Sequence, residues 1–206
     1  MRTQSFDGAF GQGPAQESHG GSTYCAVSAY SLAGQLEQRF PSKRRSRLVS
    51  WLLARQSEST ECTGYGGFNG RIGKFKDSCY SFWCGASLAV LSSHHLIDAR
   101  ANTAHLLRLQ TVVGGIAKTE DDHPDAMHSY LSLAALSIHT YAHSRDDDDS
   151  YGWLCPSSLR TGIHDALDPR INLSHASTRH LLQTLRALWT VAKYSRRDDC
   201  FVPTGV

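Results

Sequence analysis

The chain has 206 residues, with 21 Lys and Arg against 19 Asp and Glu, and its net charge of +2 offers no basic surface for nucleic acid. Hydrophobic residues make up 40 % of the chain, which is enough for a folded core, but no apolar run is long enough to cross a membrane. The N-terminus is too polar for a signal peptide and the six cysteines lack paired spacing, so we expect a reduced, cytoplasmic protein.

An internal repeat organises the chain from its first residues onward. A glycine turn that ends in an apolar residue occurs three times, at Phe10, Phe68 and Ile116. Nine residues after each of these comes an ionisable residue, namely His19, Asp77 and Asp125. Fourteen residues after each comes an aromatic residue, namely Tyr24, Phe82 and Tyr130. A unit that recurs about every 50 residues predicts a helical solenoid or a closed helical ring.

The segments between the turns predict an all-α fold with two kinds of helix. Helices rich in small and apolar residues follow each turn and are expected to be inner and buried. Amphipathic outer segments include residues 48–53, 106–109 and 181–189. We expect a partial ring of about three to four helix pairs over residues 1–195, and a flexible tail over 196–206.

Two segments between the repeats carry less information. Lys43-Arg44-Arg45 is expected to begin a solvated helix. Residues 144–167 are expected to form a long loop, and the acidic run at 145–150 lies within it.

Parallel inner helices would place His19, Asp77 and Asp125 at one end of the ring, where helix N-termini favour an anion.

Asp77 and Cys79 lie two residues apart at the expected start of an inner helix, so both side chains can reach one atom. One oxygen and one sulfur ligand suit zinc, but two ligands are too few. His128 occupies the repeat position of Tyr80, next to Cys79, and is expected to supply the third ligand. Three protein ligands with one open position are typical of a catalytic zinc site.

Each of these three residues also has a structural interpretation. An Asp before a helix is usually an N-cap, and a buried Cys usually packs as a small apolar residue. A single histidine among 11 is usually no ligand. Because the three residues share their repeat phase, we weigh the metal hypothesis equally with these structural interpretations.

A second group of polar residues could bind a phosphate or diphosphate. Its members are His19, Arg71, Lys74 and Tyr80. The alternative is that Arg71 and Lys74 are solvated loop cations and that local turn groups satisfy His19. Nearby Tyr24, Cys25, Phe82 and Trp83 either pack in the core or line an apolar tunnel.

Three residue strings, in this order along the chain, resemble the β subunits of protein prenyltransferases. The strings are Glu17–Cys25, Gly67–Trp83 and Gly114–His128. The resemblance is greatest to the β subunits of the type I geranylgeranyltransferases, and it covers roughly residues 6–188. It has no counterpart for residues 144–157 or for the tail.

The resemblance implies an α-α toroid, in which outer helices surround inner ones, paired in a heterodimer with a separate helical α subunit. It implies one zinc ion on Asp77, Cys79 and His128. The residues that it implies for the isoprenoid diphosphate are His19, Arg71, Lys74 and Tyr80. Cys25 and Trp83 match positions lining the isoprenoid pocket, and Gly21 would allow a close approach.

The position of Lys118 separates the members of the family. The farnesyl relatives carry an acidic residue there, which helps to bind magnesium, whereas type I geranylgeranyl enzymes carry a lysine and need no magnesium. Lys118 therefore implies type I. The implied reaction transfers a geranylgeranyl group from its diphosphate to the cysteine of a C-terminal CaaX motif, through a zinc-bound thiolate. Small GTPases are typical of such protein substrates. The catalytic group comprises Asp77, Cys79, Tyr80, Lys118 and His128.

The chain departs from the family by beginning inside what should be a middle repeat. We therefore expect it to be the C-terminal portion of the toroid, with N-terminal repeats missing. One alternative is a non-catalytic toroid fragment that acts only as a partner-binding module. Others are a farnesyl or Rab-type β subunit, and a helical repeat scaffold without a metal.

Overall fold

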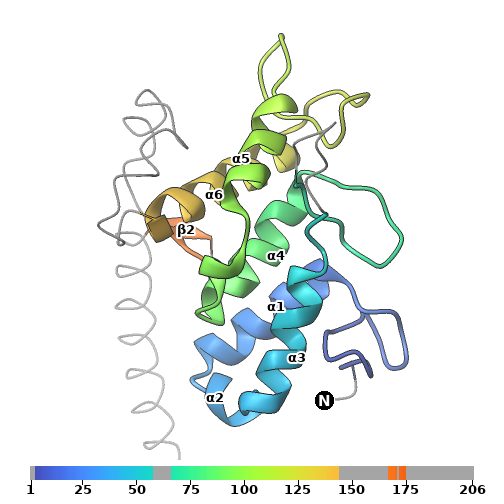
Figure 1. Ribbon diagram of the computed structural model, residues 1–206, viewed down its shortest axis with the longest axis vertical. Coiled ribbons are helices and arrows are strands. Elements are labelled where there is room, and N and C mark those ends of the chain that lie inside the picture. The colour runs from blue at the N-terminus through green and yellow to red at the C-terminus, as the bar shows by residue number, and fades with distance from the viewer. Residues whose placement is uncertain (1–2, 58–65, 144–166, 171, 175–206) are drawn as a thin grey trace, which may run out of the picture.

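The computed structural model describes residues 3–57, 66–143, 167–170 and 172–174, and the regular secondary structure in this part of the chain is almost entirely helical (Figure 1). The inner helices are α1 (Gly20–Leu32), α4 (Cys79–Val90) and α6 (Ala126–His143). The other helices are α2 (Leu36–Arg39), α3 (Ser42–Leu53), the short 3₁₀ helix η1 (His94–Leu96) and α5 (Ala99–Arg108). Strands β1 (Leu167–Asp168) and β2 (Leu173–Ser174) pair antiparallel. The all-α prediction is confirmed.

The predicted repeat is visible in the backbone of the three glycine turns. Each apolar residue that ends a turn forms a β-bridge to a residue before the turn, in the pairs Gln4–Phe10, Gln56–Phe68 and Gln110–Ile116. In the first repeat the amide of Phe10 donates to the hydroxyl of Thr23 at 3.1 Å, and in the third the amide of Ile116 donates to Ser129 at 2.8 Å. The same bonds therefore join each of these turns to the helix that follows it.

Helix α4 is the centre of the packing. It contacts α1 on one side and α6 on the other, while α3 and α5 lie against the inner layer as outer helices (Figure 1). Phe68, Leu88 and Cys84 pack with α1 and α3, whereas Phe82 and Ala86 pack with α6. The expectation of buried inner helices holds most fully for α4, because α1 exposes Cys25 and α6 exposes Leu133.

A buried chain of hydrogen bonds ties α4, α5, α6 and η1 together. Ser81 Oγ donates to Asn102 Oδ1 at 2.8 Å, and Asn102 Nδ2 lies 2.7 Å from His139 Nε2. His139 Nδ1 in turn lies 2.8 Å from His94 Nε2. Since buried polar groups are costly without partners, this chain fixes the relative positions of the four elements.

Several predicted segments lie outside the described residues. They are the long loop over 144–166 with its acidic run, the amphipathic segment 181–189, and the tail 196–206. The basic stretch Lys43-Arg44-Arg45 does begin a helix, α3, at the protein surface. Within the described ranges, no helix combines the length and the apolar character that crossing a membrane requires.

Candidate active site

The start of α4 presents two adjacent side chains to two different neighbours. Cys79 faces the third repeat, where His128 lies in the first turn of α6. Tyr80 faces the first repeat, where His19 caps α1. Successive residues of a helix point about 100° apart, so neighbours in sequence reach different partners. The site therefore consists of one cluster on each side of this helix start.

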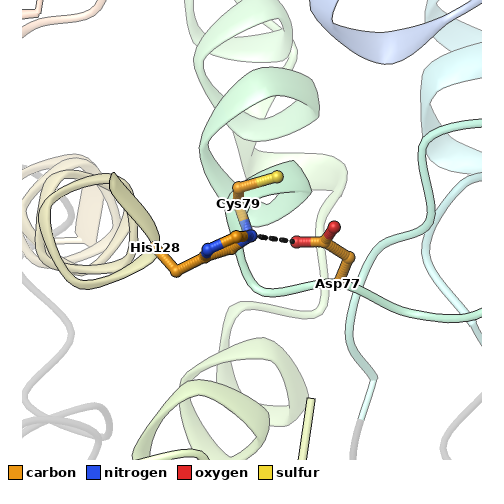
Figure 2. Close-up of side chains that lie close together, drawn as sticks. All are labelled: Asp77, Cys79 and His128. Carbon is orange, nitrogen blue, oxygen red and sulfur yellow. Dashed lines mark hydrogen bonds and ion pairs between the residues drawn. The ribbon is translucent and has the colours of Figure 1, made fainter. Parts of the chain in front are cut away.

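The structure brings together the three residues expected to bind a metal (Figure 2). The ligand atoms of Asp77, Cys79 and His128 all lie within 4.8 Å of one another. Asp77 Oδ1 accepts a hydrogen bond from the amide of Cys79 at 3.0 Å and lies 3.3 Å from His128 Nε2. Asp77 is not the N-cap of α4, which is Ser78, but it does bind the backbone at the helix start and also faces His128.

The chemistry of this cluster fits a zinc ion. It offers one carboxylate oxygen, one thiol sulfur and one imidazole nitrogen, the ligand types that zinc prefers. Burial, with the Asp77 carboxylate beside it, raises the pKa of the Cys79 thiol well above its ordinary value. A bound cation would reverse that effect, because metal coordination favours the deprotonated thiol.

Asp125 orients His128, a role that the analysis of the sequence missed. Its Oδ2 lies 2.6 Å from His128 Nδ1, and its Oδ1 accepts the amide of His128 at 2.9 Å. These hydrogen bonds hold the pKa of Asp125 below its ordinary value. A carboxylate on one nitrogen of a histidine directs the other nitrogen toward a metal, here toward Asp77 and Cys79. The spacing of three residues at a helix start was the available signal.

The two ring nitrogens of His19 bind different parts of the structure. Its Nδ1 accepts hydrogen bonds from the amides of Gly21 at 3.1 Å and Ser22 at 3.4 Å, so it caps α1. Its Nε2 lies 2.9 Å from the hydroxyl of Tyr80. Because Nδ1 is an acceptor, we assign the proton of the neutral ring to Nε2, which then donates to Tyr80. Burial and the nearby Arg71 lower the pKa of His19, which favours this neutral form.

The basic residues near this pair are exposed. Arg71 forms an ion pair with Glu17 at 3.5 Å, and its charge acts on both His19 and Tyr80. Burial raises the pKa of Tyr80 to about 12, so its hydroxyl keeps its proton and can donate it to a ligand. Lys74 is exposed on the same loop, but no described contact brings its side chain to the pair.

Lys118 contributes its backbone to the start of α4. Its carbonyl accepts a hydrogen bond from the amide of Ser78 at 3.1 Å, which places this part of the third repeat beside Asp77 and Cys79. Its side chain is exposed. The backbone of Lys118 therefore lies next to the start of α4, beside the cluster of Asp77 and Cys79.

Comparison with known proteins assigns a family. A family model described as "Prenyltransferase alpha-alpha toroid domain" matches residues 1–191. The chain belongs to this family. It is 44 % identical over 135 residues to the geranylgeranyl transferase type-1 subunit beta of Dictyostelium discoideum, covering 65 % of this chain and 36 % of that protein. It is 38 % identical over 145 residues to its Arabidopsis thaliana namesake, covering 67 % of this chain and 37 % of the relative.

A solved structure agrees with this assignment. The toroid chain superposes on the Candida albicans protein geranylgeranyltransferase-I complexed with GGPP with a TM-score of 0.68 and 27 % identity. The match covers 86 % of this chain and 46 % of the other. This toroid chain therefore spans between about a third and a half of the length of the relatives that it matches.

The aromatic side chains near the toroid's candidate site form a cluster of tilted and edge-to-face rings. The ring of Tyr24 lies 5.1 Å from that of Phe82 and 5.2 Å from that of Trp83, and Phe82 and Trp83 lie 5.3 Å apart. Phe82 is fully buried, as the core alternative held, whereas Trp83 is half-buried. Cys25 is exposed beside Tyr24, and a side chain at Gly21 would meet the His19 ring at 3.3 Å.

Proposed function

We propose that this chain is part of the β subunit of a protein geranylgeranyltransferase type I. The observation that supports the proposal is the pair of clusters at the start of α4, with Asp77, Cys79 and His128 gathered on one side and the hydrogen-bonded pair of Tyr80 and His19 on the other. Such an arrangement suits a reaction between a thiol and a diphosphate ester, since it places a site for each reactant side by side. The similarity to the type-1 β subunits supports this assignment.

Asp77, Cys79 and His128 would hold one zinc ion, and Asp125 would orient His128. When bound, zinc supplies a Lewis acid that stabilises a substrate cysteine as its thiolate at neutral pH. Cys79 and His128 are buried and Asp77 is partly buried, so the cluster is largely shielded from bulk solvent. Burial strengthens the attraction of the acidic cluster for a cation.

The diphosphate of the isoprenoid would bind on the other side of the helix start. In the transfer step, the substrate sulfur forms a bond to C1 of the isoprenoid as the C1–O bond breaks. The diphosphate leaves with the electron pair of that bond, and the thiol proton passes to solvent. Tyr80, Arg71 and the exposed Lys74 would donate to the oxygens on which the charge grows, while His19 holds Tyr80 in place.

Lys118 carries the choice of type I within the family. Its ammonium would meet the leaving diphosphate where farnesyl relatives hold magnesium through a carboxylate, so no magnesium is expected. The proposal includes a separate α subunit as partner, CaaX proteins such as small GTPases as substrates, and a cytoplasmic location.

A transfer assay on the purified heterodimer tests the proposal. Geranylgeranyl and farnesyl diphosphate would each be offered with a peptide ending in Cys-a-a-Leu and with one ending in Cys-a-a-Ser. Geranylgeranyl transfer to the Leu peptide is expected to be fastest. Faster farnesyl transfer to the Ser peptide would assign a farnesyl enzyme, and no transfer with any pair would favour the non-catalytic alternative.

The Lys118→Asp variant tests the role of Lys118. Its transfer rate is expected to fall without magnesium and to recover as magnesium is added, because the new carboxylate can hold the ion near the diphosphate. The wild-type heterodimer, measured over the same magnesium range, is the control. A variant whose transfer rate does not change with magnesium concentration would remove the reason for assigning type I.

A further inference from the structure

The ring of Tyr80 lies in a slot between two glycines that come from different repeats. A methyl group at Gly70 would lie 2.1 Å from Tyr80 Cζ and 2.5 Å from its hydroxyl oxygen. A methyl group at Gly20 would lie 3.1 Å from Tyr80 Cδ1. A hydrogen bond of 2.9 Å from the amide of Gly20 to the carbonyl of Gly70 closes the slot. Neither glycine has a positive φ, so space around the ring, not backbone conformation, demands a glycine at position 70.

The backbone next to Gly70 is firmly held. The amide of Asn69 donates to the carbonyl of Arg55 at 2.9 Å, and Asn69 Oδ1 accepts from the buried Arg55 guanidinium at 3.2 Å. Arg55 lies over the ring of Trp51, 4.8 Å from its centroid. Because these hydrogen bonds hold the backbone at Gly70 in place, a side chain at position 70 would displace the ring of Tyr80 instead.

The slot determines what the hydroxyl of Tyr80 can do. His19 Nε2 donates to Tyr80, since His19 Nδ1 is an acceptor in the cap of α1. The proton of Tyr80 is therefore not used by His19 and can be donated to an anion. A hydrogen-bond donor is most effective when its direction is fixed before the ligand arrives.

We propose that Gly70 is a positioning residue, which by its lack of a side chain holds the phenol of Tyr80 against His19 as an aligned donor to an anion. The inference rests on the proposed function for the identity of that anion, the diphosphate of the isoprenoid. Gly70 itself touches no reacting atom, and acts through Tyr80 alone.

A double-mutant cycle on the purified heterodimer tests this, with inorganic pyrophosphate as the probe and calorimetry as the measurement. Gly70→Ala is expected to weaken pyrophosphate binding roughly tenfold, the loss of one hydrogen bond to a charged group. In a Tyr80→Ala background the same Gly70→Ala change is expected to alter binding less than about twofold, since no ring remains to be displaced. Equal losses in both backgrounds would mean general damage to the loop, and would overturn the proposal.

Gly85→Ala is the matched control. Gly85 lies on α4 with Tyr80 and has an ordinary backbone conformation, and the nearest atom to an added methyl group would be 3.9 Å away. Pyrophosphate binding by this variant is expected to match the wild type. If Gly70→Ala alone fails to fold, recovery of folding by Tyr80→Ala would support the proposal, and failure to recover would overturn it.

A crystal structure of the Gly70→Ala heterodimer separates this inference from the proposed function. The contact of 2.9 Å between Tyr80 and His19 is expected to be lost. A retained contact would overturn the positioning role. A lost contact with unchanged pyrophosphate binding would support the action of Gly70 on Tyr80, but would contradict the role of Tyr80 in binding the diphosphate.

Discussion

The two clusters at the start of α4 differ in charge and in contact with solvent. The cluster of Cys79 is acidic and largely buried, with His128 only 7 % exposed. The cluster of Tyr80 is half-buried and lies beside the exposed cation of Arg71. A buried acidic cluster is stable only with a compensating cation, whereas an open basic one suits an anion that must enter and leave. The two clusters therefore differ in burial and in charge as their proposed ligands, a cation and an anion, require.

The largest effect is expected on the buried side of this comparison. Cys79→Ala or His128→Ala removes one of the three proposed zinc ligands, so zinc is expected to fall from one ion to on the order of a tenth of an ion per heterodimer. Metal analysis of the purified protein measures this. Cys84→Ala, which removes another buried thiol from α4, should leave the zinc content unchanged. Full zinc in the Cys79 variant would disprove the ligand assignment.

Removal of the carboxylate behind His128 should have a smaller effect. Asp125→Ala is expected to weaken zinc about 10- to 100-fold, because His128 loses the partner that orients its ring. Competition with a chelator measures the affinity. Asp98→Ala is the matched control, since Asp98 caps α5 through the amide of Ala101 but contacts no metal ligand. Equal zinc loss in both variants would assign Asp125 to capping alone.

The exposed side of the comparison predicts selectivity for one substrate. Arg71→Ala is expected to weaken the isoprenoid diphosphate roughly tenfold and the peptide hardly at all, because its guanidinium lies near Tyr80 and His19. Equilibrium binding of each substrate to the heterodimer measures the two effects. Arg44→Ala, an exposed arginine at the start of α3, should change neither. A larger loss of affinity for the peptide than for the diphosphate would mean that the two substrate sites are assigned the wrong way round.

The last effect is a dependence of stability on pH at His105 of α5, which is 7 % exposed. Burial, with some repulsion from Lys76, lowers the pKa of His105 to about 4. The unfolded residue binds its proton near its ordinary pKa of 6.5, so stability from neutral His105 is complete above that pH and is lost as pH falls toward 4. Between about pH 7.5 and 5 we expect a loss of about 2 kcal/mol in the free energy of unfolding.

Denaturant unfolding of the heterodimer at both pH values measures this loss. The His105→Gln variant should lose less stability on acidification than the wild type, because it has no proton to take up on unfolding. His123→Gln, at an exposed histidine, should behave as the wild type. An unchanged acid sensitivity in His105→Gln would show that the folded protein does not lower the pKa of His105.

The repeat phase predicted much of this arrangement from the sequence. His128 was expected beside Cys79 because it occupies the repeat position of Tyr80, and repeats that pack side by side bring equivalent positions together. The sequence offered the local turn and the group with Tyr80 as alternatives for His19, whereas the structure gives it both, one on each ring nitrogen. The orientation of His128 by Asp125 and the slot around Tyr80 depend on side-chain directions, which spacing alone does not determine.

The adjacency of Cys79 and Tyr80 has a consequence for how such a site can change over evolution. One trans peptide unit separates their Cα atoms by about 3.8 Å, a covalent distance that no mutation short of an insertion can alter. If the chain acts as proposed, the backbone anchors of the metal ligand and of the diphosphate donor therefore keep a fixed spacing. A longer or shorter isoprenoid would then be accommodated at residues such as Tyr24 and Trp83, where one side chain can change in size without altering that spacing.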